Sequence, residues 1–386
     1  MSLDGNSKGE IFAALATMID WKEAFNRQDP KLGILSFIKN GVRPSLIPTL
    51  ISYFQNRSMF VKWQGVKSKP RTLNGGGPQG GTFGIFEYLS QSNSNANCVN
   101  SELRWKWVDD LTILEIINLV NIGMSCFNVK NLVPNDINVN KNFVHKSELL
   151  TDNNLREINN WTSNQKMKLN NKKTNYMIFN FTEKYQFSTR LDLDGDTIQE
   201  KENIKLLGTT ITNDLKWEEN TKNLVKKGNS RMCLLRAVSN FNPPLEDLKK
   251  IYIQYIRSIL EQSCVVWHSS LTQEDSDNIE RVQKNALRVI LKSNYQDYQN
   301  ALEKLNLESL EERREKLCLS FAKKCLKIPQ ACELFKEKTK IHTMDLRNTE
   351  RFNENISNTK RYQYSAVPYM QRLLNKYHKE KQSLQN

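Results

Sequence analysis

The stretch LRWKWVDDLTILEI (residues 103–116) sets two adjacent carboxylates between two apolar runs. Its first half alternates apolar and cationic side chains, which indicates a half-buried strand, and residues 111–116 are rich in strand formers. The pattern predicts a hairpin with Asp109 and Asp110 at its bend. Two-residue hairpin turns favour Asn-Gly or Asp-Gly because their central residues need positive φ, whereas Asp-Asp adds like-charge repulsion. Taken alone, the stretch is most simply interpreted as an exposed acidic turn.

The composition of the whole chain favours a globular protein with a polyanionic partner. With 386 residues, 38% apolar and 25% charged, the chain can bury a sizeable core. Its formal net charge of +14 favours nucleic acid, and less strongly an anionic membrane surface, as the partner. A basic but unspecific surface would give the same charge. Charge alone therefore does not choose among these partners.

The N-terminal residues carry no secretory or membrane signal. The first ten residues are polar, and the apolar run at residues 11–19 is too short to span a bilayer and ends at Asp20. We therefore expect no membrane partner and an intracellular protein, in the nucleus or the cytoplasm.

Cysteine and histidine spacing argues against disulfides and zinc. The seven cysteines are odd in number and scattered, which indicates a reducing compartment. Cys318, Cys325 and Cys332 recur at helical spacing, which does not match a zinc site. Cys264 and His268 lie one helical turn apart and are interpreted as core residues. We expect no zinc site.

The first half of the chain mixes strand and helix signals. Residues 11–19 predict a buried strand, and a helix is expected to begin after Asp29, with Pro30 at its first position and Gly41 just beyond its end. Further elements are expected as follows: a helix over 44–57 interrupted or begun by Pro48, a strand over 58–65 with a turn at Gly65, a helix over 82–91, a helix over 150–167 and a strand over 173–181.

The second half has a different pattern. Residues 191–199 resemble a calcium loop at a glance, but the ligand spacing is wrong for an EF-hand, and Asp194-Gly195 predicts a hairpin turn. From about residue 215 onward, amphipathic helical runs follow one another. The first run carries four cations that are either a solvated helix face or contacts to nucleic acid: Lys222, Lys226, Lys227 and Arg231. The final forty-odd residues are polar and are expected to be loosely ordered.

The double acid is the last of three sequence motifs that occur in a fixed order. Asp20 ends an apolar strand, the Gly-rich NGGGPQGGTFG follows, and Val-Asp-Asp completes the series. This ordered series resembles the palm of a reverse transcriptase of the non-LTR retrotransposon type, and weaker similarity continues over residues 10–330. The resemblance implies an α+β fold: a reverse-transcriptase-like palm with an antiparallel sheet packed by helices (1–214), a helical thumb (215–295) and a helical tail (296–386).

The resemblance also implies a chemistry. It predicts an RNA-directed DNA polymerase, a nucleotidyltransferase that joins a dNTP to a primer 3′-hydroxyl with two Mg²⁺ ions, or Mn²⁺ in their place. Convergent carboxylates suit this chemistry, because Mg²⁺ takes oxygen ligands and relieves the repulsion between acids. The implied partners are an RNA template, a DNA primer and the dNTP.

Site residues follow from the resemblance position by position. Asp20, Asp109 and Asp110 correspond to the catalytic, metal-binding acids, with a direct metal contact less certain for Asp110 because neighbours on an extended backbone point apart. Three groups correspond to the nucleotide site: Phe25, which would exclude a 2′-hydroxyl; the motif Pro78, Gln79 and Gly80; and Lys173 near the triphosphate. Ordinary packing for Phe25, a flexible linker for the Gly-rich run and a solvated lysine for Lys173 stay as alternatives.

Three positions depart from the family pattern. Asn26, Gly81 and Trp107 stand where the family usually has an acid, a serine and a smaller aromatic. Because the resemblance begins almost at Met1, we expect the fingers to be largely missing. The alternative to a polymerase is therefore a catalytically inactive retroelement remnant that acts only as a basic nucleic-acid-binding protein.

Overall fold

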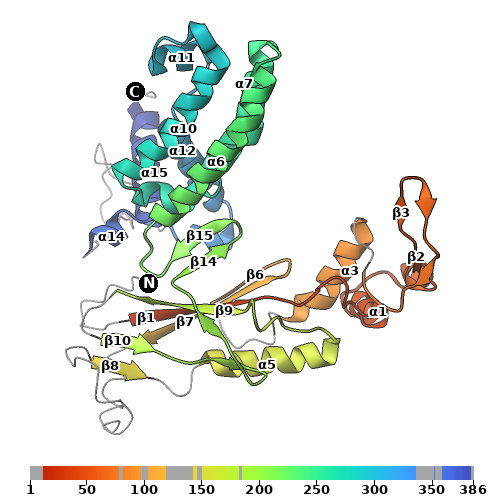
Figure 1. Ribbon diagram of the computed structural model, residues 1–386. Coiled ribbons are helices and arrows are strands. Elements are labelled where there is room, and N and C mark those ends of the chain that lie inside the picture. The colour runs from red at the N-terminus through yellow and green to blue at the C-terminus, as the bar shows by residue number, and fades with distance from the viewer. Residues whose placement is uncertain are drawn as a thin grey trace, which may run out of the picture. The chain divides into compact units, whose positions relative to one another are not determined.

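The computed structural model describes residues 12–77, 81–95, 97, 103–118, 142–145, 150–181, 185–335, 352 and 359–383. Two compact units divide the chain near residue 203, an N-terminal unit of sheet and helices and a C-terminal unit that is mostly helical (Figure 1). The mixture of helices with a largely antiparallel sheet confirms the predicted α+β class.

A five-stranded sheet forms the centre of the N-terminal unit, in the order β13-β9-β1-β7-β6. All neighbouring pairs are antiparallel except β13 with β9. The bounds of the strands are β1 (Phe12–Ile19), β6 (Arg104–Trp107), β7 (Asp110–Asn118), β9 (Asn175–Asn180) and β13 (Gln199–Glu200). The central strand β1 is the buried strand expected at residues 11–19.

One face of this sheet is covered by helix α5 (Leu150–Gln165) (Figure 1). Leu15 of β1, Ile113 of β7 and Ile158 of α5 are at most 1% exposed and belong to one core. Glu115 of β7 lies on the same side, and its carboxylate accepts hydrogen bonds from the backbone N–H and the hydroxyl of Thr151 in the first turn of α5. A carboxylate there favours the helix N-terminus. The opposite face of the sheet carries the candidate site.

Three helices extend the N-terminal unit: α1 (Pro30–Lys39), α2 (Ile47–Phe54) and α3 (Thr82–Ser92), with 3₁₀ turns at Pro44–Leu46 and Asn93–Asn95. Asp29 caps α1 as predicted, because its carboxylate accepts the N–H groups of Lys31 and Leu32. The proline expected to interrupt or begin the second helix lies in the first turn of α2. These three helices confirm the sequence expectations.

Short strands fill the remainder of the N-terminal unit. The strand expected at 58–65 is instead two short pieces, β2 (Ser58–Met59) and β3 (Lys62–Trp63), paired with β5 (Arg71–Thr72) and β4 (Val66–Lys67). All residues from 58 to 72 are exposed, so no core supports a longer ladder there. The other pairs are β8 (Asn142–His145) with β10 (Tyr185–Ser188), and β11 (Asp192–Leu193) with β12 (Asp196–Thr197). The last pair confirms the hairpin at Asp194-Gly195.

The C-terminal unit begins with a hairpin and continues with helices. The bounds are β14 (Asn203–Leu206), β15 (Thr209–Thr212), α6 (Glu218–Ser239), α7 (Leu245–Ile251), a π-helix (Tyr252–Arg257), α8 (Ser258–Leu260), α9 (Cys264–Trp267), α10 (Gln273–Leu291), α11 (Tyr298–Leu305), α12 (Leu310–Cys325), α13 (Pro329–Cys332), α14 (Lys360–Gln363) and α15 (Ala366–Ser383), with 3₁₀ turns at His268–Ser270 and Lys292–Asn294. In the part of the chain that is described, no helix is both long enough and apolar enough to cross a membrane.

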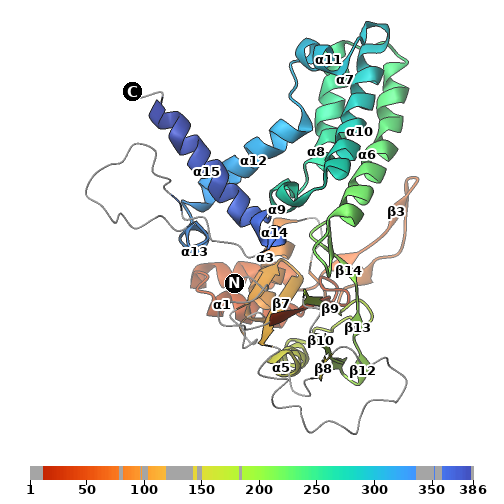
Figure 2. The ribbon, with the colours of Figure 1, turned by 90° about the vertical axis from the view of Figure 1, so that its left-hand side faces the viewer.

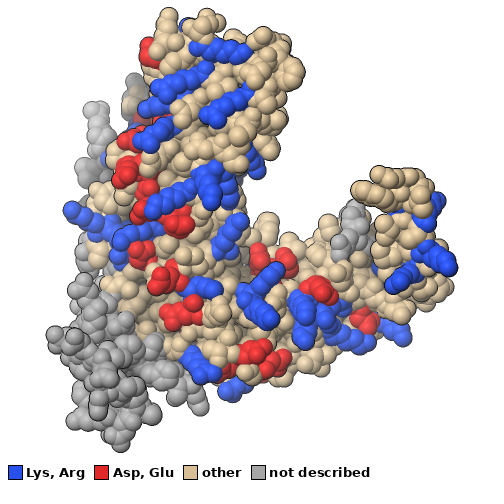
Figure 3. Space-filling model, viewed as in Figure 1, with Lys and Arg blue, Asp and Glu red and all other residues tan. Residues whose placement is uncertain are grey.

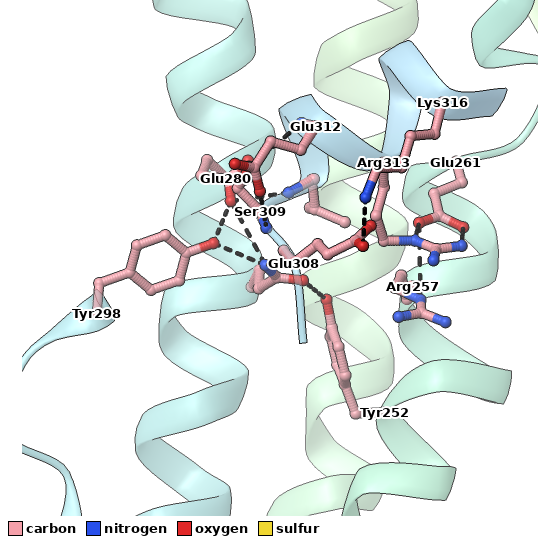
Figure 4. Close-up of polar contacts among 12 residues, drawn as sticks. Tyr252, Arg257, Glu261, Glu280, Tyr298, Glu308, Ser309, Glu312, Arg313 and Lys316 are labelled. Atoms are coloured by element: carbon pink, nitrogen blue, oxygen red, sulfur yellow. Dashed lines mark hydrogen bonds and ion pairs between the residues drawn. The ribbon is translucent and has the colours of Figure 1, made fainter. Parts of the chain in front are cut away.

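A polar network fastens the connection between α11 and α12 to the helices beneath it (Figure 4). Gln283 of α10 is fully buried, and its amide donates to the Tyr298 hydroxyl at 2.6 Å and to the Glu308 carbonyl at 3.0 Å. The Tyr252 hydroxyl of the π-helix donates to the Gln283 side-chain oxygen. Nearby, Arg313 of α12 forms an ion pair with Glu261. These contacts satisfy buried polar groups and fix the register of α12 on α10.

Helix α15 packs across α12 (Figure 2). Met370, Leu373 and Leu374 are buried in one cluster with Cys318 and Cys325 of α12. The two cysteines thus have the helical spacing expected from the sequence and pack in the core. Where the sequence predicted a loosely ordered polar end, residues 366–383 form a helix, because a few apolar side chains at helical spacing are enough to seat it.

Candidate active site

The double acid lies at the tip of the β6–β7 hairpin, as predicted. Trp107 pairs with Asp110 across the hairpin, so Val108 and Asp109 are the two central residues of the turn. Val108 has a φ of 57°, and it is the only one of the two with a positive φ, as in a type II′ turn. Because β-branched residues rarely adopt this conformation, the turn holds strain of about 1–3 kcal/mol. The structure therefore places a strained backbone next to the acids.

Strand register puts Asp20 and Asp110 on one face. Ile19 of β1 pairs with Leu111 of β7, and continuing the ladder by one residue sets Asp20 opposite Asp110. Directly opposed residues of an antiparallel pair project to the same side of the sheet. Ile19 and Leu111 point into the core beneath α5, so the two carboxylates project from the other, open face.

The shifted pKa of Asp110 agrees with the placement of the three carboxylates near one another. Burial, followed by the charges of Asp109 and Asp20, raises the pKa of Asp110. Each neighbouring carboxylate disfavours ionisation of the next, and a bound cation would relieve this repulsion. The donors are all carboxylate oxygens, which are the ligands that Mg²⁺ prefers. Within the described residues, however, no group of three or more His, Cys, Asp and Glu side chains is close enough together to hold a metal ion.

The Asp20 side chain is held by the turn that precedes β9. Asn170 donates its side-chain N–H to Asp20 Oδ2 at 2.9 Å, and the Asp20 backbone N–H donates to the Thr174 hydroxyl at 3.2 Å. Lys173 belongs to the same turn, since its backbone N–H donates to the Asn170 carbonyl. The Lys173 side chain is exposed. The structure therefore places Lys173 in the same turn as the residues that hold Asp20, and its expected role at the triphosphate stays a prediction.

Trp21 connects the two acidic segments. Its indole N–H donates to the Asp109 carbonyl at 2.7 Å, and its ring packs edge-on against Trp161 of α5, with ring centroids 5.4 Å apart. Trp21 is 6% exposed. This contact fixes the hairpin tip against the end of β1. Sequence reasoning missed both Trp21 and Asn170, because nothing in their local patterns marks the residues that they contact.

Phe25 lies between the Gly-rich segment and the acids. Its ring packs against Tyr88 of α3, with ring centroids 4.7 Å apart, and it is half-buried against the core. Burial raises the pKa of Tyr88, and the charges of Asp109 and Asp110 raise it further, which places Tyr88 close to the acidic turn. Phe25 is therefore both a packing residue and a neighbour of the site.

The Gly-rich segment lies against the turn that carries Phe25. Gly77 donates its N–H to the Phe25 carbonyl and Gly76 to the Gln28 carbonyl, both at 2.8 Å. A Cβ on Gly77 would lie 1.7 Å from Gln28 Oε1 and 3.1 Å from Glu87 Oε2, so any side chain there would force the Gln28 side chain to move. This close contact argues against a flexible linker for residues 74–77. The predicted nucleotide contacts Pro78, Gln79 and Gly80 lie outside the described residues.

A half-buried lysine lies on the hairpin beside the acids. Lys106 of β6 donates to the Ser92 carbonyl at the end of α3 and to the Ser92 hydroxyl. Burial lowers its pKa to about 8, and the charge of Asp109 opposes that shift. Lys106 therefore anchors β6 to α3 and supplies positive charge near the turn. Its alternation with tryptophans in the sequence had indicated a strand only.

The basic run on α6 makes contacts within its own unit. Lys222 forms an ion pair with Glu218 at 2.6 Å, and the Arg231 guanidinium lies 4.4 Å above the Tyr255 ring and donates to the Tyr255 carbonyl. Figure 3 shows many further Lys and Arg side chains on the visible face of the C-terminal unit. Two of the four cations thus have partners within the unit, and contacts of this helix to nucleic acid stay a prediction.

Comparison with known proteins is consistent with the class that the sequence motifs imply. No protein-family model matches the chain. The chain is similar to a curated RNA-directed DNA polymerase of a transposon. That relative is the "Probable RNA-directed DNA polymerase from transposon BS" of Drosophila melanogaster, 23% identical over 309 residues, which are 77% of this chain and 31% of the relative. The chain thus spans about a third of that protein, and the similarity supports a reverse-transcriptase-like function at the level of the family.

Proposed function

We propose that the N-terminal unit is the palm of an RNA-directed DNA polymerase of the non-LTR retrotransposon type, and that the C-terminal unit is its thumb and tail. One observation carries the proposal: Ile19 pairs with Leu111, so continuing the ladder by one residue sets Asp20 opposite Asp110, with Asp109 at the adjoining turn. Similarity to a transposon polymerase supports the same class.

Asp20 and Asp110, with Asp109 at the adjoining turn, would supply carboxylate ligands for Mg²⁺, and the phosphates of the dNTP would supply further oxygen ligands. When bound, two such ions would activate the primer 3′-hydroxyl and hold the leaving pyrophosphate. In the reaction, the primer 3′-oxygen forms a bond to the α-phosphorus of the dNTP, the bond to pyrophosphate breaks, and the hydroxyl proton passes to solvent. The chain's task is to hold the carboxylates in register and to orient the nucleotide.

Other side chains orient the components. Asn170 fixes one carboxylate oxygen of Asp20 through its 2.9 Å hydrogen bond. Lys173, exposed in the same turn, would meet the triphosphate. Phe25, backed by the Tyr88 ring, would lie under the sugar and exclude a 2′-hydroxyl. The RNA template and DNA primer would lie over the open face of the sheet.

Primer extension tests the proposal. The full chain is incubated with a DNA primer annealed to an RNA template, with dNTPs and Mg²⁺ or Mn²⁺. Extension is expected to depend on the metal and to fall by at least about 100-fold in Asp109→Ala. The matched control is Glu202→Gln, which removes an exposed acid outside the site. The absence of extension by the wild-type chain, or equal extension by Asp109→Ala, contradicts the proposal.

A second candidate function is binding without catalysis by a retroelement remnant. One observation favours it: the described residues include no cluster of three metal-ligating side chains. This candidate predicts salt-sensitive binding of nucleic acid that survives Asp109→Ala, with no extension under any metal. The same primer-extension experiment, accompanied by a binding titration, separates the two functions.

A further inference from the structure

Residues 57–72, between α2 and the Gly-rich segment, form a projecting two-stranded arm, here called the basic arm (Figure 1). β2 pairs with β5 at its base and β3 with β4 at its tip. Gln64 and Gly65 form the tip turn with φ of 46° and 84°, which is the type I′ geometry that suits a hairpin. All residues from 58 to 72 are exposed, so the arm is a preformed element with no core of its own.

The two faces of the arm differ in chemistry. Lys62 pairs with Lys67 across the hairpin, so both side chains project from one face, where the Lys67 ammonium lies 5.0 Å from the Phe60 ring centroid. Trp63 pairs with Val66 on the opposite face. The exposed fraction is 74% for Trp63 and 73% for Val66. The arm therefore presents cations on one side and a free indole ring on the other.

The charge of the arm has a single sign. Its sixteen residues contain five cations and no acid: Arg57, Lys62, Lys67, Lys69 and Arg71. Within the described part of the chain, none of the ion pairs involves these five side chains. Figure 3 shows blue and tan surface, and no red, at the outer end of the lobe that carries β3. This distribution complements a polyanion.

We propose that the basic arm is a binding site for single-stranded nucleic acid, with phosphates along the Lys62–Lys67 face and a base stacked on Trp63. Proteins that bind single strands combine a basic track with aromatic side chains on which bases stack. The arm brings these two elements together on one hairpin. This binding site goes beyond the proposed polymerase function, because binding there requires neither the acids Asp20, Asp109 and Asp110 nor a dNTP.

A protein partner or a second copy of the chain is the competing occupant of the apolar face. Five cations in sixteen residues disfavour a second copy, since two arms would repel one another. An exposed indole on a hairpin whose other face carries lysines suits a base and its phosphates. Counterion release then makes the strength of binding depend on salt.

The test measures the affinity of the full chain for a fluorescently labelled single-stranded RNA, about twenty nucleotides long, from fluorescence anisotropy. The titration is repeated at several salt concentrations, without dNTP or divalent metal. Lys62, Lys67 and Lys69 are changed together to Gln. The matched control changes Lys376, Lys379 and Lys381, three exposed lysines of α15, in the same way and removes the same charge. The variant of the basic arm is expected to bind with a weaker salt dependence. The magnitude of the slope of log K, where K is the association constant, against log salt concentration should fall by about 2, at about 0.7 per lost phosphate contact. The control is expected to change the slope by less than half as much.

A second experiment uses Trp63→Ala. Loss of one stacked base is expected to weaken binding about 5- to 150-fold at constant salt, and Trp63→Phe should recover part of it. Since Trp63 is exposed, circular dichroism should show both variants folded. The proposal would be overturned if the variants of the basic arm bound the RNA with unchanged affinity, or if the α15 control lost as much affinity. It would also be overturned if sedimentation showed that Trp63→Ala changes dimerisation while RNA affinity stays the same. Asp110→Asn should leave this binding intact, which separates its failure from that of the polymerase proposal.

Discussion

Glu87 of α3 predicts a pH-dependent stability of the N-terminal unit. The side chain has no exposed surface, and among the described residues neither carboxylate oxygen has a hydrogen-bond partner. Burial raises the pKa of Glu87 from 4.5 to about 7, the charge of Arg57 opposes the shift, and Asp29 adds to it. The carboxyl lies beneath Gly33 and Gly77, whose missing side chains leave it room. Protonated Glu87 is therefore the form that the fold accommodates.

The sign and size of the effect follow from linkage. Because the folded state binds the proton more tightly than the unfolded state, the contribution to stability is complete below pH 4.5 and is lost as pH rises through about 7. The full loss is on the order of 3 kcal/mol at 1.36 kcal/mol for each pKa unit. Roughly 2 kcal/mol of it falls between about pH 5.5 and pH 8.5.

Glu87→Gln removes this dependence, because the amide has nearly the same shape and never ionises. Thermal unfolding of the wild type and the variant is compared across pH, so that contributions from other groups cancel. Between about pH 5.5 and pH 8.5 the wild type should lose about 4–8 °C relative to the variant. The control is the same change at exposed Glu202. Parallel curves for the wild type and Glu87→Gln would refute the reasoning.

Three further predictions concern the site. Asn170→Ala removes the hydrogen bond to Asp20 Oδ2 and should lower single-nucleotide extension about 10- to 100-fold with little loss of stability, as measured by rapid quench; unchanged extension would contradict it. Gly77→Ala forces Gln28 aside and should cost about 1–3 kcal/mol in denaturant unfolding, whereas Gly75→Ala, whose Cβ would lie 3.5 Å from the nearest atom, should be close to neutral. Phe25→Val should raise ribonucleotide incorporation relative to deoxyribonucleotide, measured as the ratio of kcat/KM values; a constant ratio would leave Phe25 as a packing residue.

Local patterns were enough to predict the elements on which the site is built. The hairpin at residues 103–116, the strand that ends at Asp20 and the helix capped by Asp29 are each encoded in a short window of alternation, capping or turn chemistry. The order of the acidic and Gly-rich blocks then indicated the candidate site. A short stretch of sequence cannot show how β1 and β7 pair. Their register in the structure, continued by one residue, sets Asp20 opposite Asp110.

Contacts between distant segments could not be predicted in this way. Asn170 and Asp20 are 150 residues apart in the chain, and Trp21 and Asp109 are 88 apart, so neither pair leaves a local signal. The burial of Glu87 depends on two glycines from other segments. The helix at 366–383 was missed because its buried residues are few within a polar sequence, and its stability comes from packing on α12.

Coupling between Asp20 and Asp110 tests the central claim most directly. Single-nucleotide extension on a primed RNA template is measured for Asp20→Asn, Asp110→Asn and the double variant, with Mg²⁺ present. If the two carboxylates serve one metal centre, each single change should abolish most activity and the double change should cost no more than either alone. Losses that multiply in the double variant, or extension that survives either single change, would contradict the account.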